Sequence, residues 1–333
     1  MVSPPLVESL KNDPILSRSK LISEGWDPAG LSTIGQFPKG WADWNPRMRD
    51  IVKKFAKGIA ESGPELITSI EGSPDMFPNG TPDTSVNYVT SHDGFTLYDT
   101  TAYNNAHNES NAYTSFMDYE FDNCSWNCGV EGETDDEAVN ELRKRQIKNI
   151  MTILMLSRGV PMIWAGDEFA NTQYGNNNAF SQDTEISWLD WNRLKKYDDV
   201  FEYVKKLIAF RKEHHVIKKA DYFTGYNSSG YPELSWHSEK PWNFDRSLPF
   251  LTFGFMYSEP SKDFGTDNDC FIYCGYNSHW EEHKFELPVI PEGMKWSIVL
   301  YSGDEKMEQI GKEVNETITL MPRSSMLLIG KRK

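Results

Sequence analysis

The sequence has few of the features that mark exported, membrane-spanning or nucleic-acid-binding proteins. Its first fourteen residues contain neither the basic stretch nor the apolar run of a signal peptide. The longest apolar run, around residues 150–156, is far shorter than the roughly 18 residues that cross a bilayer. Basic residues are also scarce, because 34 Lys and Arg stand against 49 Asp and Glu, a net charge of −15. This balance disfavours nucleic acid or an anionic membrane as partner.

These absences predict a soluble, cytoplasmic protein, or a plastid protein if the sequence comes from a plant or an alga. We expect the natural N-terminus to lie upstream of Met1. Nothing in the sequence predicts an organic cofactor, and no run of oxygen ligands with the spacing of a calcium-binding loop occurs.

Cysteine is scarce as well. The four cysteines form two pairs with three residues between the partners, at 124 and 128 and at 270 and 274, a pattern that invites a zinc interpretation. However, Cys270 and Cys274 lie in an alternating, aromatic-rich run that predicts a strand, whereas zinc-ligand pairs usually sit on turns. We therefore expect reduced, buried thiols and no metal.

The residues that are present can build sizeable cores. The chain has 333 residues, of which 38% are hydrophobic and 13% aromatic, and this length predicts about two domains. Up to about residue 223, strand-like runs at 20–23, 86–90 and 160–164 alternate with helical patterns at 45–57 and 137–157, as in a parallel α/β sheet. Residues 224–333 show a two-residue period with frequent turns, which predicts an antiparallel β-sandwich with strands at 234–236, 251–255, 270–276, 284–287, 296–301 and 317–329.

Two carboxylates directly follow predicted parallel strands. Glu24 comes after the first strand and Asp93 after the second, 69 positions later, with His92 beside it. Active residues of α/β barrels lie at such strand ends, and the spacing leaves room for a further strand between the two. Paired carboxylates next to Trp and His suit glycoside hydrolysis. By spacing alone, ordinary helix-capping acids explain the pattern about equally well.

Several motifs favour active-site carboxylates over helix-capping acids. In their order and spacing, these motifs closely resemble those of the isoamylase and bacterial glycogen-debranching branch of the α-amylase family. Among them are ISEGWDP at 22–28, FPKGWADWNPR at 37–47, NYVTSHDGF at 87–95, SWNCG at 125–129, AGDE at 165–168 and TQYGNNNA at 172–179. The resemblance covers nearly the whole chain, and residues after 236 look like the C-terminal β domain of that family. It implies retaining hydrolysis of α-1,6 branch linkages in glycogen, amylopectin or limit dextrins.

The resemblance also assigns roles to single residues. Glu24 matches the general acid and base after the fifth barrel strand, and Asp93 matches the aspartate after the seventh strand that stabilises the transition state. His92 matches the histidine that hydrogen-bonds the sugar, and Trp26 and Asp27 lie in the substrate-binding loop beside the acid. It makes Asp167 and Glu168 part of the rim structure, and it leaves loop structure and substrate contact equally open for Asn176, Asn177, Asn178 and Trp126.

The departures from the family pattern are equally informative. The nucleophilic Asp ends the fourth barrel strand in this family, yet only 23 residues precede Glu24, and Asp13 among them matches a loop rather than that strand. The family usually has Pro where this chain has Gly25, and we expect this glycine to loosen the turn that aims Glu24. The expected architecture is therefore the second half of a (β/α)8 barrel, strands five to eight, at 1–223, followed by a β-sandwich domain at 224–333.

A site without its nucleophile predicts no activity for the chain alone. Half a barrel also exposes sheet edges and apolar residues, which predicts poor solubility or association with the missing N-terminal half. The expected ligand is a branched α-glucan. Two alternatives remain open: a non-catalytic glucan-binding or regulatory subunit, and an amylase or glucanotransferase that acts on α-1,4 links.

Overall fold

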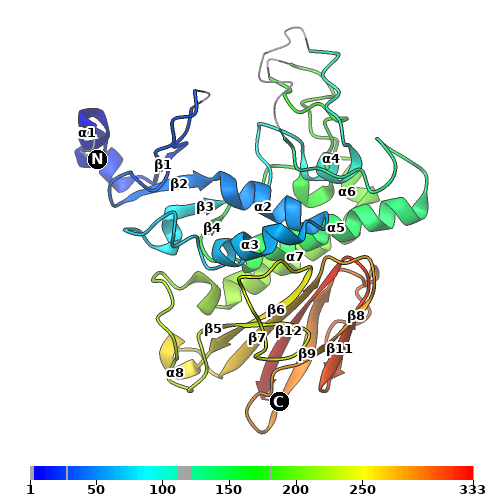
Figure 1. Cartoon of the computed structure of the whole chain (residues 1–333). Helices are drawn as coiled ribbons and strands as arrows, with labels where there is room; N and C mark the ends of the chain where they lie inside the picture. The colour runs from blue at the N-terminus through cyan, green and yellow to red at the C-terminus, as the bar shows by residue number, and fades with distance from the viewer. Residues whose placement is uncertain (1–3, 28, 112–121, 181, 333) are drawn as a thin grey trace.

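The computed structural model describes residues 4–27, 29–111, 122–180 and 182–332, so Pro28 of the first motif lies outside the described residues. The chain forms a short parallel sheet, a layer of helices, and two antiparallel sheets. Figure 1 shows helices α2, α3, α5 and α7 lying over the large antiparallel sheet, with the parallel strands beside them. The carboxyl ends of the parallel strands carry the long loops.

The parallel sheet has four strands that follow one another in space as they do in the chain. Its order is β1-β2-β3-β4, and each neighbouring pair is parallel. The further strand expected between the two carboxylates is β2, although its position was not predicted. The strands are β1 (Leu21–Ser23), β2 (Trp41–Asn45), β3 (Ser85–Asn87) and β4 (Val160–Pro161), so the last two are shorter than predicted.

Both predicted helices are confirmed, as α2 (Pro46–Ala56) and α5 (Glu137–Leu156). Their starts follow from capping, because the Asn45 and Asp136 side chains accept hydrogen bonds from backbone amides of the first turn. No described helix has the length and apolar character needed to cross a membrane. The remaining α-helices, which were not predicted, are α1 (Pro5–Asn12), α3 (Gly63–Ile70), α4 (Leu97–Ala102), α6 (Arg193–Lys196), α7 (Asp198–Glu213) and α8 (Ser261–Phe264).

The C-terminal part forms two antiparallel sheets, as predicted. The larger has the order β10-β9-β12-β7-β6-β5, and the smaller pairs β11 with β8. The predicted strand at 317–329 is in fact two strands, which belong to different sheets. The strands are β5 (Leu234–His237), β6 (Thr252–Glu259), β7 (Cys270–Asn277), β8 (His283–Glu286), β9 (Met294–Tyr301), β10 (Glu313–Val314), β11 (Thr317–Leu320) and β12 (Ser324–Arg332).

One continuous core joins the helices to the larger antiparallel sheet. Phe55 of α2 and Leu207 of α7 belong to the same buried cluster as Phe253 and Tyr257 of β6. The Tyr257 hydroxyl donates to the carbonyl of Leu156, at the end of α5, over 2.9 Å. A second cluster fills the space between the two antiparallel sheets. All four cysteines are buried and unpaired, which confirms the prediction of reduced thiols.

Candidate active site

The parallel sheet brings the two sequence-predicted carboxylates to one edge. Glu24 directly follows β1, and Asp93 lies a few residues beyond β3. Because parallel strands present their carboxyl ends on the same side, both side chains belong to that rim. Glu24 and Asp93 are exposed, and so is His92, whose Nε2 lies 3.5 Å from Asp93 Oδ2.

A buried phenol connects the two carboxylates electrostatically. Burial raises the pKa of Tyr88 well above its ordinary value, and Arg49 opposes this shift. The negative charges of Glu24 and Asp93 are among those that raise it further. Both carboxylates therefore lie near enough to Tyr88 for their charges to act on its hydroxyl group.

Four aromatic rings cluster at this rim and form what we call the aromatic floor: Trp44, Tyr88, His92 and Trp164. The ring centroids of Trp44 lie 5.1 Å from those of Tyr88 and 5.9 Å from those of His92, and His92 lies 6.3 Å from Trp164. Ligand sites are typically lined by such rings with a few polar groups placed among them. Sequence reasoning assigned no role to Trp44, Tyr88 or Trp164, although each stands at a strand end.

The loop after Glu24 is held by its own hydrogen bonds. Oδ1 of Asp27 accepts from the amides of Ala29 and Leu31 over 2.8 and 3.1 Å, so this carboxylate forms the turn. Trp26 pairs with Ser32 across the loop. The structure therefore shows a turn-forming role for Asp27, beside the substrate-binding role that the resemblance implies.

Gly25 packs more tightly than expected. Its carbonyl accepts from the Thr33 amide over 2.6 Å, and a Cβ at position 25 would lie 2.9 Å from the backbone nitrogen of Ile34. Real Cβ atoms do not tolerate this distance. The expectation that Gly25 loosens the turn is therefore wrong, because the missing side chain permits a close backbone approach.

Asp167 anchors the segment that carries His92 and Asp93. It lies in a 3₁₀ helix, Asp167–Phe169, after β4. Its carboxylate accepts hydrogen bonds from the Thr90 hydroxyl and, over 2.8 Å, from the Leu97 amide. The segment 90–97 is thus held at both ends by one buried side chain, which agrees with a structural role for Asp167.

The same carboxyl makes stability depend on pH. Burial raises the pKa of Asp167 to about 7, against the opposing hydrogen bonds from Thr90 and Leu97. The folded state therefore binds this proton more tightly than the unfolded state, whose pKa is near 3.8. The stabilisation is fully present below about pH 4 and is lost as pH rises through 7.

Asp167→Asn should remove this dependence, since the amide does not ionise. Its oxygen can still accept from the Leu97 amide, and its NH2 group can donate to the Thr90 hydroxyl. We expect the stability of the wild type relative to the variant to fall by on the order of 4 kcal/mol between pH 4 and pH 8. Urea unfolding across that range measures it, with the exposed Asp135→Asn as the control for losing a carboxylate. A difference that stays constant or grows with pH contradicts the assignment.

The asparagines at 176–178 join two loops of the rim. Asn177 Oδ1 accepts from Asn108 Nδ2 over 2.7 Å, and Asn176 Nδ2 donates to Asn111 Oδ1 over 2.6 Å. The Asn177 carbonyl also accepts from the Gly94 amide over 2.9 Å, directly after Asp93. Of the two roles left open by the resemblance, these contacts support loop structure for Asn176 and Asn177.

Trp126 likewise has a packing partner. The guanidinium of Arg323, which follows β11, lies 4.4 Å from the centroid of its ring. This contact ties the loop before α5 to the antiparallel sheet.

Asp13, which sequence reasoning did not accept as a nucleophile, forms a turn instead. Its Oδ1 accepts from the amides of Ile15 and Leu16 over 2.8 and 2.9 Å, and these bonds lower the pKa of this exposed carboxyl.

Comparison with known proteins shows which proteins this chain resembles. The chain is 35% identical to the glycogen operon protein GlgX homologue of Mycobacterium tuberculosis, over 97% of this chain and 47% of that protein. It is 36% identical to the chloroplastic isoamylase SU1 of Zea mays, over 92% of this chain and 37% of that protein. The chain thus spans less than half the length of these relatives. No protein-family profile matches it.

Solved structures show the same fold. The pullulanase of Paenibacillus barengoltzii superposes with a TM-score of 0.68 at 22% identity, over 98% of this chain and 46% of that chain. A type I pullulanase of Bacillus subtilis, solved with maltose, gives 0.66 at 19% identity, over 98% and 41%. This chain therefore has the fold of one part of those larger molecules.

Proposed function

Since the chain is a homologue of the isoamylases and bacterial glycogen-debranching enzymes of the α-amylase family, we propose that it carries one half of a debranching active site. The proposed reaction is hydrolysis of α-1,6 branch linkages in glycogen, amylopectin or limit dextrins. The observation that carries the proposal is the placement of Glu24 and Asp93, in the motifs of that family, at the strand ends around Tyr88.

In the proposed mechanism, Glu24 acts first as general acid and then as general base. It protonates the oxygen of the leaving chain, and after the glycosyl intermediate has formed it accepts a proton from the attacking water. Asp93 stabilises the positive charge that develops at the sugar ring, and His92 holds a sugar hydroxyl. Trp26 and Asp27 line the substrate-binding loop.

A retaining mechanism also requires a carboxylate nucleophile about 5 Å from the acid. We propose that it comes from the part of the relatives that this chain does not cover, whether in the same polypeptide or in another. On this view residues 1–223 supply strands five to eight of a (β/α)8 barrel, and residues 224–333 form the C-terminal β-sandwich domain.

The edges of the parallel sheet support this arrangement. Among the described strands, β1 pairs only with β2 and β4 only with β3, so each outer edge can accept a further strand. Ile22 on β1 is 47% exposed. Beside β4, a groove of about 330 Å³ runs along α7 and is lined mainly by apolar side chains, among them Ile163, Phe201, Val204 and Ile208. We propose that the missing half of the barrel covers these surfaces.

Linkage analysis tests the proposed reaction. The chain would be assembled with an N-terminal half of a relative that ends in the fourth strand, and the complex would be incubated with glycogen. We expect the proton signal of α-1,6 linkages to disappear from the NMR spectrum while the α-1,4 signal stays unchanged. Loss of the α-1,4 signal would instead support the amylase alternative. A glucanotransferase would leave both signals unchanged, because it forms one α-1,4 link for each that it breaks, and would change only the distribution of chain lengths. Glucan binding without any bond cleavage would support a non-catalytic subunit.

A further inference from the structure

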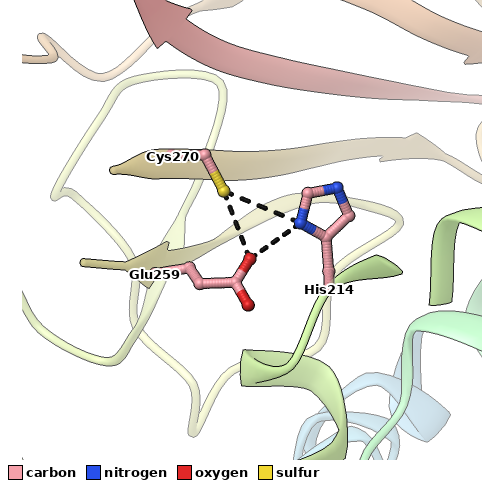
Figure 2. A group of neighbouring side chains, drawn as sticks. All are labelled: His214, Glu259 and Cys270. Carbon is pink, nitrogen blue, oxygen red and sulfur yellow. Dashed lines mark hydrogen bonds and ion pairs between the residues drawn. The ribbon is translucent and has the colours of Figure 1, made fainter. Parts of the chain in front are cut away.

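Away from the rim, three side chains of metal-binding types meet inside the protein. His214 follows the last residue of α7, Glu259 ends β6 and Cys270 begins β7, and Figure 2 shows their polar atoms turned toward one another. Nδ1 of His214 lies 2.7 Å from Oε2 of Glu259, and Sγ of Cys270 lies 3.2 Å from that oxygen and 3.7 Å from Nδ1. All three side chains are more than nine-tenths buried. Among the described residues, this is the one such cluster of three or more ligand types.

The carboxylate of this cluster is fixed in place. Its other oxygen, Oε1, accepts from the backbone amides of His215 and Val216 over 2.5 and 3.0 Å. Burial opposes ionisation of Glu259, but these bonds and the contact with His214 outweigh it and lower the pKa of the carboxyl. The two backbone hydrogen bonds hold Glu259 with Oε2 toward His214 and Cys270, which is the kind of outer support that metal-binding carboxylates have.

A path leads from solvent to the cluster. A cavity of about 390 Å³, open to solvent, is lined by all three side chains and by three further acids, Glu213, Asp267 and Asp269. One lysine, Lys331, also lines the cavity, but the acids outnumber it, so the wall attracts cations, and the opening admits both an ion and water. A purely structural hydrogen-bonded cluster has no need of such an entrance.

We propose that His214, Glu259 and Cys270 bind a divalent ion of the zinc type, with water from the cavity as a fourth ligand. In a tetrahedral zinc site, nitrogen, oxygen and sulfur ligands lie roughly 3.3 to 3.6 Å apart. The two distances from Sγ lie close to that range, and the separation of Nδ1 and Oε2 would widen by about half an ångström. One nitrogen, one sulfur and one oxygen favour zinc over calcium or magnesium, which prefer oxygen ligands.

When the ion binds, the thiol of Cys270 loses its proton. Burial and the charge of Glu259 raise the pKa of this thiol, so in the absence of a cation it keeps its proton. A divalent ion favours the thiolate, and the thiol proton leaves to solvent through the cavity. The proton that Nδ1 of His214 shares with Glu259 in the metal-free cluster moves to Nε2, so the neutral imidazole binds the ion through Nδ1. The bound ion would fasten the end of α7 to β6 and β7, and this role is independent of the proposed debranching activity.

Cobalt is a suitable probe, because a cobalt–thiolate bond gives an intense charge-transfer band in the near ultraviolet. The full 333-residue chain, freed of metals by chelation, would be titrated with Co²⁺. We expect the band to saturate at one equivalent and to disappear on addition of Zn²⁺ but not of Mg²⁺ or Ca²⁺. Cys270→Ser should abolish the band, and His214→Gln should weaken binding about tenfold or more.

Cys274→Ser is the matched control, since Cys274 is buried in the same strand but lies outside the cluster. It should keep the band. A wild-type chain without the band, or a Cys270→Ser variant that retains it, overturns the proposal. If Cys270→Ser does not fold, alkylation of the cysteines in the wild-type chain provides the test. Zn²⁺ should slow the alkylation of Cys270 and leave that of Cys274 unchanged. Equal rates of alkylation of Cys270 with and without Zn²⁺ would refute the site.

Discussion

Glu24→Gln is expected to lower kcat on glycogen by about 10² to 10⁴-fold in the complex of this chain with a complementary N-terminal half. The amide has nearly the shape of the acid but cannot donate a proton to the leaving oxygen. In kcat/KM, which reports the steps up to the glycosyl intermediate and not the later general-base step, the loss should be much smaller on a maltosyl fluoride, because fluoride leaves without protonation. This difference between substrates separates a general acid from a residue that only shapes the site.

The control for this variant is Glu65→Gln, which replaces an exposed glutamate of α3 and should leave both activities unchanged. Equal losses of kcat/KM on glycogen and on the fluoride would show that Glu24 acts through structure rather than through proton transfer to the leaving group. An unchanged rate on glycogen would remove Glu24 from the mechanism altogether.

Arg211→Met is expected to reduce the free energy of unfolding by about 3 to 5 kcal/mol. Arg211 projects from α7, is buried, and donates to the carbonyls of Met155, Ser157 and Gly159 over 2.6 to 2.7 Å. The last carbonyls of a helix have no partner within it, and here the guanidinium supplies one for the end of α5. Burial lowers the pKa of Arg211 to about 10, so the group still carries its charge at neutral pH.

The turn that Arg211 holds is tightly packed. Gly159 lies in that turn with φ of +112°, and a Cβ there would lie 2.8 Å from Asn87 Nδ2. Methionine keeps the volume of the arginine side chain but leaves the carbonyls buried and unpaired. Urea unfolding measures the loss, and Lys212→Met, at the exposed neighbouring position, should change stability by less than about 0.5 kcal/mol. A similar value for the two variants would contradict the capping role.

The site residues that could be predicted from the sequence are those that lie in short local motifs. Glu24 and Asp93 follow apolar strand residues, and the sequence motifs around them are specific enough to indicate a role for each residue. Strand β2 was missed for a physical reason. Asp43 and Asn45 lie buried within it, so the alternation of apolar and polar residues that predicts a strand is absent.

Those buried polar residues are satisfied by partners distant in the chain. The Ser23 hydroxyl donates to Asp43, and Asn45 Nδ2 donates to the hydroxyls of Ser73 and Ser85 over 2.8 and 2.9 Å. Such hydrogen bonds form only when distant segments come together in the folded chain, so a short window of sequence gives no signal for them. The same applies to the cluster at Cys270, since its three residues come from three different elements.

Helix α7 was overlooked although its signals are local. Asp198 and Asp199 provide an acidic first turn, and Val200, Val204 and Leu207 recur at helical spacing on its buried face. The aromatic floor could be predicted only in part. Its rings stand at strand ends that the sequence partly located, but only the register of β2, β3 and β4 brings Trp44, Tyr88 and Trp164 near His92.

The most direct test of the central claim is a count of the reducing ends released from glycogen by the purified chain, alone and together with an N-terminal half that ends in the fourth barrel strand. If this chain supplies the acid and the stabilising aspartate while the other half supplies the nucleophile, only the mixture will release reducing ends, and Glu24→Gln in the mixture will suppress them. Debranching by the chain alone would contradict that division of the site, and it would place the nucleophile among the residues of this sequence.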